Sequence, residues 1–307
     1  MKKNPYDSSD LNMKRRPHES PPQDIPSSQA CPEWKETLPQ KFLRHVFDAP
    51  LLRKPIWKFW YNFAARVDGR AGHLKLMNFG YAPEEGGKLL PDLEPADEPH
   101  RNTIQMYVHA VGRKPLDGLD VLEVGCGRGG GAFSLMKYAR PRTLTGLDLS
   151  PKAVHLARKA YALPGLSFLQ GDAENLPFPD SSFDAAVNVE SSHCYPNIRR
   201  FLAEVFRVLR PGGRFYYVDF RRIADLPEWE GAVSESDFQV LEKEDITADV
   251  VRALTRDSAR KEDLMRARIP RFLHPAFRKF VCTVGSENYQ SFIEGRRYYY
   301  RYLLVKD

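Results

Sequence analysis

A histidine and a cysteine stand side by side in the segment NVESSHCYPN, residues 188–197, directly after an apolar run. Histidine titrates near neutral pH and can remove a proton from a reacting hydroxyl, so His193 is a candidate general base. Glu190, or another carboxylate, is the candidate group that orients the imidazole. A purely structural hydrogen bond is the alternative role for His193. A metal site with Glu190 and Cys194 is disfavoured because no second cluster of ligands is recognisable, and no metal is expected.

A second segment of chemical interest is glycine-rich. It reads VLEVGCGRGGG, residues 121–131, and lies between an apolar run and a helical pattern. Glycines there let the backbone approach a ligand closely and leave helix N–H groups facing it. The GxGxxG spacing, followed about twenty residues later by Asp148, also occurs in dinucleotide-binding proteins. Glu123 favours S-adenosylmethionine instead, because its carboxylate can pair with a cationic amino group, whereas a pyrophosphate would gain nothing from it.

Alternating strand and helix patterns from about residue 117 onwards must position these segments. Ser150 and Pro151 predict the N-cap and first residue of a helix over SPKAVHLARKAYA. A second helix, IRRFLAEVFRVLRPGG, is expected to stop at its glycines. The alternation predicts an α/β fold with a parallel sheet covered by helices on both faces. Ligands of such sheets bind beyond the carboxyl ends of the strands, where Asp148 and residues 188–197 are expected.

Changes in composition divide the chain into five parts. The first is rich in proline, serine and charged residues, which bury too little apolar surface to order a chain. The second carries closely spaced aromatic residues, among them Trp60, that either pack into a core or face an apolar substrate. We expect a disordered tail (1–38), an N-terminal helical cap (39–112), a core (113–253), a helical lid (254–292) and a final strand of the core (293–307).

The overall composition is that of an ordinary globular protein, with 42% hydrophobic residues and a formal net charge of +6. The basic residues are spread along the chain, which argues against nucleic acid as a partner. The four cysteines form no CxxC pair, and the N-terminal residues MKKNPYDSSD lack the apolar core of a signal peptide. We therefore expect a cytoplasmic protein without stable membrane insertion, either a monomer or a homodimer.

Four segments in this order resemble the motifs of class I S-adenosylmethionine-dependent methyltransferases: VLEVGCGRGGG, LTGLDLSPKAV, GDAENLPFPDSSFDAAVNVES and EVFRVLRPGGRFYYVDF. The resemblance spans about residues 117–220. It implies a Rossmann-like, seven-stranded, mostly parallel sheet with helices on both faces, N-terminal helices and a helical insert before the last strand. It also implies an enzyme that converts S-adenosylmethionine to S-adenosylhomocysteine.

The same resemblance implies roles for individual residues. Asp148 would bind both ribose hydroxyls and Asp172 the exocyclic amine of adenine, while for each acid a helix cap or a surface charge is the alternative. Cys126 is expected to be a small spacer rather than a nucleophile. The cofactor-binding positions implied are Glu123, Gly125, Cys126, Gly127, Asp148, Leu149, Asp172, Ala173, Asn188, Gln105 and Tyr81.

The flanking segments LMNFGYAPEEGG, DEPHRNTIQMYVHAVG, NVESSHCYP and FIEGRRYYYRYLLVKD resemble bacterial methyltransferases of the phthiotriol/phenolphthiotriol dimycocerosate type, which O-methylate a hydroxyl on a polyketide-derived lipid. This resemblance implies a hydrophobic small-molecule acceptor. The place of His193 and Glu190 in the loop after an apolar strand makes these two the candidate catalytic residues. The lid would enclose that acceptor or merely cover a sheet face. The candidate acceptor-binding residues are Tyr195, Trp60, His274, Tyr298 and Tyr300.

Three other functions stay open at this point. Related enzymes methylate carbon in isoprenoid, sterol-like or quinone acceptors, where Glu190 and aromatic faces would stabilise a carbocation. A scaffold protein that binds the cofactor without catalysis would use the proline-rich tail as its binding module. An NAD-dependent oxidoreductase is disfavoured by Glu123 and by the lack of a recognisable hydride-transfer site.

Overall fold

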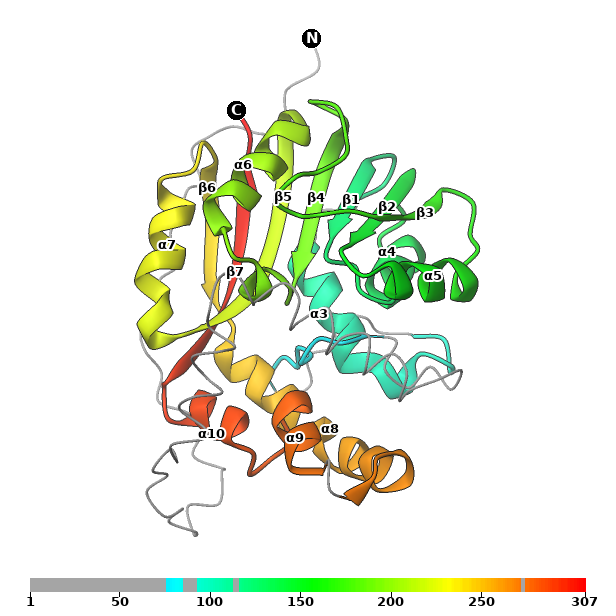
Figure 1. Ribbon diagram of the computed structural model, residues 1–307, viewed down its shortest axis with the longest axis vertical. Helices are drawn as coiled ribbons and strands as arrows, with labels where there is room; N and C mark the ends of the chain where they lie inside the picture. Colours follow the sequence, from blue (N-terminus) through cyan, green and yellow to red (C-terminus); the bar gives the residue numbers. More distant parts are fainter. Residues whose placement is uncertain (1–75, 85–92, 113–115, 272–273) are drawn as a thin grey trace. The chain divides into compact units, whose positions relative to one another are not determined.

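The computed structural model describes residues 76–84, 93–112, 116–271 and 274–307. The expected tail, most of the expected N-terminal cap and Trp60 lie outside the described residues. Figure 1 shows the arrangement of the helices and strands.

The described residues contain a seven-stranded sheet in the order β3-β2-β1-β4-β5-β7-β6. Strands β1 to β5 pair in parallel, whereas β7 is antiparallel to both β5 and β6. The mostly parallel sheet expected from the sequence is thereby confirmed. The strands are β1 Asp120–Val124, β2 Thr143–Asp148, β3 Leu166–Gln170, β4 Phe183–Val189, β5 Leu209–Arg222, β6 Gln239–Asp245 and β7 Arg297–Val305.

The strand order reverses direction between β1 and β4. The chain leaves β1 toward β2 on one side and leaves β4 toward β5 on the other, so the loops that follow β1 and β4 diverge. A crevice opens at such a point beyond the carboxyl ends of the strands, and ligands of open α/β sheets bind there. The glycine loop and the segment that begins at Glu190 are these two loops.

Helices cover both faces of the sheet, each face with its own buried apolar cluster. Buried residues of α3, α4, α5, α8 and α10 belong to one cluster, and those of α6 and α7 to the other. The helices are α3 Arg101–Val111, α4 Gly130–Tyr138, α5 Pro151–Ala160, α6 Ile198–Val208, α7 Leu226–Ser234, α8 Thr247–Arg268, α9 His274–Val281 and α10 Glu287–Ile293, with short 3-10 turns at η1 Glu98–His100, η2 Ser192–Cys194 and η3 Ile223–Asp225.

Local sequence signals explain where two of these helices begin and end. The Ser150 hydroxyl caps α5 by accepting the N–H of Ala153 at 3.2 Å, which confirms the predicted start. The predicted glycine stop of α6 is wrong, because the helix ends at Val208 and the glycines lie within β5. Pro211 disfavours helical backbone at the residue before it, and buried Leu209 already pairs with Phe183 of β4.

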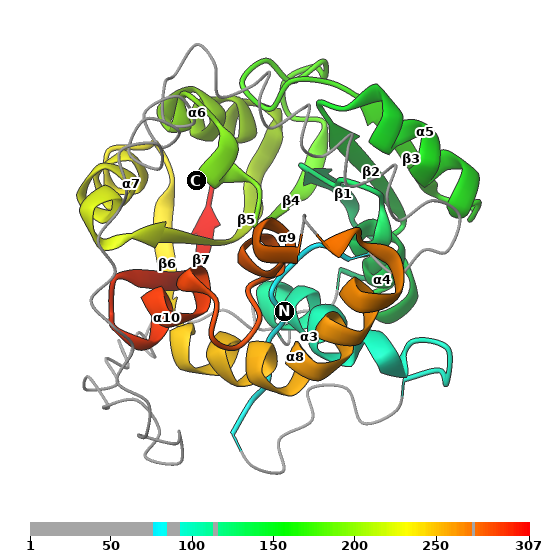
Figure 2. The ribbon, with the colours of Figure 1, turned by 60° about the horizontal axis from the view of Figure 1, so that its bottom comes forward.

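The predicted helical insert before the last strand is formed by α8, α9 and α10. Helix α8 begins at Thr247, so the expected domain boundary at residue 254 falls inside it. The first residue of β7, Arg297, pairs with the last residue of β5, Arg222, so the insert lies at the carboxyl edge of the parallel strands. Figure 2 views the molecule from that edge and shows α8, α9 and α10 grouped there.

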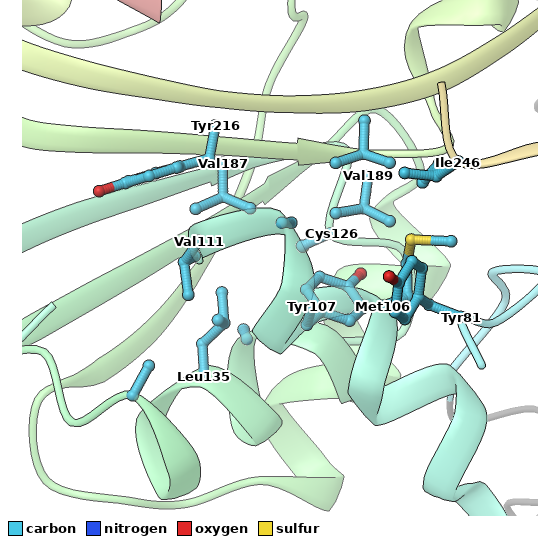
Figure 3. Packing of buried hydrophobic residues seen from close by; sticks show 14 of the residues in the cluster. Tyr81, Met106, Tyr107, Val111, Cys126, Leu135, Val187, Val189, Tyr216 and Ile246 are labelled. Atoms are coloured by element: carbon cyan, nitrogen blue, oxygen red, sulfur yellow. The ribbon is translucent and has the colours of Figure 1, made fainter. Parts of the chain in front are cut away.

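The packing of α3 against α4 depends on a glycine. A Cβ atom at Gly131 of α4 would lie 2.0 Å from Cζ of Tyr107, so the tyrosine ring occupies the space that a side chain would fill. Figure 3 shows Tyr107 and Met106 of α3 within the cluster that also contains Val187 and Val189 of β4. The absence of a side chain at Gly131 therefore allows the Tyr107 ring, and with it the Tyr107 hydroxyl, to take this position.

Replacing Gly131 by alanine should lower the free energy of unfolding by about 1–3 kcal/mol, because the added methyl group overlaps the Tyr107 ring. Gly231→Ala is the matched control. Gly231 lies inside α7, where an added Cβ meets only a side-chain oxygen at 3.8 Å, and alanine there should raise the stability by up to about 1 kcal/mol through helix propensity. Urea denaturation of both variants checks this, and equal effects of the same sign would contradict it.

Candidate functional site

A pocket lies at the carboxyl ends of β1, β2 and β4 and is closed on one side by α3 and residues 76–78. Most of the cofactor positions expected from the sequence line it: Gly125, Cys126, Gly127, Asp148, Leu149, Asp172 and Ala173. Glu190 and Tyr195 line it as well. The structure therefore brings together residues from four separate loops at one place.

The floor of the pocket is the backbone of the glycine loop. Gly125 and Gly127 have φ angles of +77° and +52°, which L side chains rarely adopt. A Cβ at Gly125 would lie 2.2 Å from the hydroxyl oxygen of Ser191, and one at Gly127 would lie 2.8 Å from Cε of Met77. Glycine at these positions therefore keeps the pocket open and lets the loop after β4 approach closely.

Asp148, at the end of β2, is fixed by two backbone donors. Its Oδ2 accepts the N–H of Gly127 and its Oδ1 accepts the N–H of Ser150, both at 2.8 Å. Burial raises the pKa of this carboxyl, while the two backbone bonds oppose that rise. The carboxylate thus joins the glycine loop to the start of α5 and faces the pocket.

Glu123 of β1 is buried beside the pocket rather than on its lining. Its Oε1 accepts the hydroxyl proton of Tyr107 at 2.8 Å, whereas its Oε2 has no hydrogen-bond partner among the described residues. Burial raises the pKa of Glu123 to about 7, against the opposing effect of the bond from Tyr107. A buried carboxylate with an unused oxygen would be stabilised by a cationic donor.

Three other expected cofactor residues, Asn188, Gln105 and Tyr81, also lie outside the lining. Asn188 donates to the carbonyl of Val124 at 2.9 Å and to the Ser191 hydroxyl at 2.7 Å, which ties the loop after β4 to β1. Gln105 donates to the carbonyl of Tyr81 at 2.9 Å. These residues hold the walls of the pocket in place.

Glu190 stands at the start of the loop after β4 in a left-handed backbone conformation, with φ of +49°. Its Oε1 accepts the N–H of Phe79 at 2.5 Å and the hydroxyl of Tyr299. Burial raises the pKa of Glu190 to about 7. This carboxylate therefore gathers residues 76–84 and β7 around the pocket.

His193 lies on η2 between pocket-lining residues, although its own side chain is not part of the lining. Its Nδ1 and its backbone N–H bond to the two carboxylate oxygens of Asp219 in β5, both at 2.9 Å. The carboxylate that orients the imidazole is thus Asp219 and not Glu190. The His193 ring also packs against Phe220, with ring centroids 4.5 Å apart.

The charges of this pair depend on each other. Burial alone would lower the pKa of His193, but its interactions with Cys194 and Asp219, including the bond to Asp219, raise it to about 10. Burial alone would raise the pKa of Asp219, but the charges of His193 and Arg221 hold it well below its usual range. In the free protein the pair is therefore an imidazolium and a carboxylate at neutral pH.

The expected acceptor residues are spread over the molecule. Tyr195 lines the pocket, and His274 bonds to the carbonyl of Ile269 at 2.8 Å in the helical insert. Tyr298 and Tyr300 stack on each other, and Tyr300 also stacks on Trp229 of α7, which belongs to the cluster on the other face of the sheet. Trp60 lies outside the described residues.

Sequence reasoning missed four residues of the site: Tyr107, Met77, Asp219 and Tyr299. Tyr107 and Met77 line the pocket, and Asp219 and Tyr299 bond to His193 and Glu190. The alternation of side chains along a strand predicts that Tyr299 faces away from Tyr298 and Tyr300, but only the packing decides which face meets the site. Asp219 interrupts the apolar run FYYVDF of β5, and an acid within such a run is the sequence signal that would have found it.

Two features are absent from residues 76–84, 93–112, 116–271 and 274–307. No three or more His, Cys, Asp or Glu side chains cluster there as a metal site would require. Likewise, none of the helices described is both long enough and apolar enough to cross a membrane.

Comparison with known proteins identifies the family. A protein-family profile described as a methyltransferase domain matches residues 122–217. A phthiotriol/phenolphthiotriol dimycocerosates methyltransferase of Mycobacterium leprae is 41% identical over 255 residues, which are 83% of this chain and 93% of that protein. A fatty-acid O-methyltransferase of Mycolicibacterium smegmatis is 41% identical over 249 residues, 81% of this chain and 89% of that protein.

Solved structures agree at the level of the fold. A geranyl diphosphate methyltransferase in complex with GPP and sinefungin matches with a TM-score of 0.60 at 17% identity, covering 83% of this chain and 98% of that one. The fold, the glycine loop with its acids and the 41% identity to the curated relatives agree with one another. The chain therefore belongs to the class I S-adenosylmethionine-dependent methyltransferases, in the group that includes the phthiotriol/phenolphthiotriol dimycocerosates enzymes.

Proposed function

We propose that this enzyme transfers the methyl group of S-adenosylmethionine to an oxygen atom of a hydrophobic lipid or polyketide acceptor, with His193 as general base. The observation that carries the proposal is the His193–Asp219 pair at the edge of the cofactor pocket. The relatives support the acceptor class, since one is named for a dimycocerosate lipid and another for fatty-acid O-methylation.

The residues at the pocket fit the cofactor. S-adenosylmethionine supplies a methyl group on a positively charged sulfur together with a cationic amino group. The unpartnered Oε2 of Glu123 suits that amino group, and the Asp148 carboxylate suits the ribose hydroxyls. Asp172 and Ala173 also line the pocket, and we propose that they contact the adenine.

The hydroxyl of an acceptor must lose its proton as the new C–O bond forms. Asp219 bonds to Nδ1 of His193, so Nε2 is the ring nitrogen that takes this proton. The imidazole must first be neutral, and a positive sulfonium bound in the pocket would favour the neutral form because like charges repel. Asp219 then stabilises the imidazolium that results, as the carboxylate of a catalytic triad does.

Aromatic side chains around His193 support an apolar acceptor. Phe220 packs against His193 and stacks on Phe79, with ring centroids 5.3 Å apart. Phe292 of α10 and Tyr299 of β7 complete this aromatic group. A wall of this kind excludes water from the reacting groups and favours an apolar chain over a polar one.

Methylation of carbon is the second candidate, and Glu190 is the observation that favours it. This carboxylate lines the pocket and contacts Tyr299 and the backbone of Phe79. A carboxylate among aromatic rings would stabilise a carbocation formed when an alkene attacks the methyl group. The two candidates differ in the atom that carries the new methyl group.

The product decides between them. We expect the purified protein to methylate oxygen when incubated with methyl-¹³C-labelled S-adenosylmethionine and with hydroxylated lipids, fatty acids or isoprenoids. Mass spectrometry detects the added methyl group, and the ¹³C chemical shift separates a methyl on oxygen from one on carbon. A product methylated on carbon would overturn the proposal in favour of the second candidate.

His193→Ala should lower kcat by about 10²–10⁴-fold and leave the Kd for S-adenosylhomocysteine unchanged, because a general base contributes to the chemical step alone. The wild-type kcat/KM for the cofactor, which reports the free protein, should rise with pH through the alkaline range, since the neutral imidazole increases as pH approaches the pKa of about 10. His155→Ala, on the exposed surface of α5, is the matched control. A decrease in kcat of less than about tenfold in His193→Ala would exclude His193 as the general base.

The affinity for the cofactor product should depend on the charge of Glu123. Its pKa of about 7 in the free protein leaves the carboxyl mostly neutral at acidic pH, whereas the cationic amino group requires the ionised form. The affinity for S-adenosylhomocysteine should therefore rise roughly five- to tenfold between about pH 6 and about pH 7.5. Calorimetric titration measures this, and Glu123→Gln should bind more weakly at both pH values. If the affinity of Glu123→Gln for S-adenosylhomocysteine rose with pH as steeply as that of the wild type, Glu123 would be ruled out as the titrating group.

A further inference from the structure

We infer that a buried hydrogen-bond chain from Trp229 through Tyr217, Ser192 and Asp219 positions the imidazole of His193 and determines which of its nitrogens accepts the proton. This inference rests on the proposed role of His193 as base. It assigns a function to four residues on η2, β5 and α7 that the cofactor pocket does not use.

The chain is continuous and buried. Nε1 of Trp229 donates to the Tyr217 hydroxyl at 2.7 Å, which lies 2.5 Å from the Ser192 hydroxyl. The Ser192 hydroxyl donates to Oδ2 of Asp219 at 2.5 Å, and Oδ1 of Asp219 lies 2.9 Å from Nδ1 of His193. Trp229, Tyr217, Ser192 and Asp219 are each at most 1% exposed, so bulk water does not compete for these bonds.

The direction of each bond follows from what each group can donate. The indole N–H of Trp229 can only donate, so the Tyr217 oxygen accepts it. The Asp219 carboxylate can only accept, so Ser192 gives its one proton to Asp219, and the Tyr217 hydroxyl must donate to Ser192. The Ser192 oxygen also accepts Nη2 of Arg221 at 2.8 Å. Its own proton is therefore left for Asp219. Every proton of the chain thus points toward the carboxylate.

Asp219 is surrounded by donors. Besides the Ser192 hydroxyl, it accepts the backbone N–H groups of His193 at 2.9 Å and Phe220 at 2.8 Å, and Arg221 lies 3.3 Å away. A carboxyl group in this setting is stabilised as the ionised acceptor. Nδ1 of His193 must then carry the proton in the bond that they share. The proton taken from an acceptor can therefore go only to Nε2.

The chain also anchors the base to the core. His193 belongs to a short 3-10 turn, which by itself would position a side chain loosely. Trp229, by contrast, is packed in the apolar cluster formed with α6 and α7. Arg221 lies over the Trp229 ring, 4.5 Å from its centroid, and so joins the two ends of the chain. The charged or titratable groups that interact with the imidazole are Asp219 of β5 and Glu190 and Cys194 of its own loop, while Arg221 of β5 pairs with the Asp219 carboxylate.

The test is the ¹⁵N NMR spectrum of the full-length protein labelled at histidine, with the His193 signals assigned by their loss in His193→Gln. Across a pH titration we expect Nδ1 of His193 to stay protonated and Nε2 alone to lose its proton. Tyr217→Phe and Ser192→Ala each remove one hydroxyl from the chain. Each should move the titration midpoint of His193 by at least about half a pH unit, because the Asp219 carboxylate loses stabilisation.

Tyr216→Phe is the matched control. Tyr216 is the neighbouring buried tyrosine of β5, but its side chain packs in the cluster with α3 and α4, whereas Tyr217 and Trp229 pack in the cluster with α6 and α7. This variant should leave the tautomer and the midpoint as they are in the wild type. An Nε2-protonated neutral imidazole in the wild type would overturn the inference, as would midpoints in Tyr217→Phe and Ser192→Ala equal to that of Tyr216→Phe.

The spectrum needs no acceptor, so this result is separate from that of the proposed function. A kcat of His193→Ala equal to that of the wild type would contradict the role of His193 as general base. The tautomer and the titration midpoint of His193 would still be measured independently of that result. Should a variant of the chain fail to fold, as seen in its circular dichroism, the other variant and the wild-type tautomer decide the matter.

Discussion

The structure around the pocket is organised by the need to supply hydrogen-bond donors to buried carboxylates. Among the described residues, Glu123, Asp148, Glu190 and Asp219 lie on or just beyond β1, β2, β4 and β5, where the edge of the sheet is covered by helices. A buried carboxylate without donors is costly. Each of these acids therefore holds a separate part of the chain against the sheet.

The partners show how this requirement shapes the site. Glu123 holds α3 through Tyr107, Asp148 holds the glycine loop, and Glu190 holds both residues 76–84 and β7. Asp219 holds the turn that carries His193. The walls of the cofactor pocket and the proposed base are thus positioned by the same kind of interaction.

The donors also differ in number and charge, which sets the charge of each acid. Glu123 and Glu190 receive neutral donors, and burial raises the pKa of each to about 7. Asp219 receives a histidine and lies beside an arginine, so its pKa falls despite complete burial. The pKa values of the buried Glu123 and Asp219 carboxyls are therefore shifted in opposite directions.

The sequence by itself determined the αβ alternation, the glycine loop and Asp148, because these depend on local periodicity, on φ angles open to glycine and on short spacings along the chain. It also singled out His193 and Glu190 by their place after a strand. Only the tertiary structure decided that Asp219 rather than Glu190 pairs with His193, and that Tyr299 rather than Tyr298 or Tyr300 faces the site. These outcomes depend on which strands become neighbours and on the face that each side chain presents. Such contacts join residues 26 and 109 positions apart, and no local pattern carries that information.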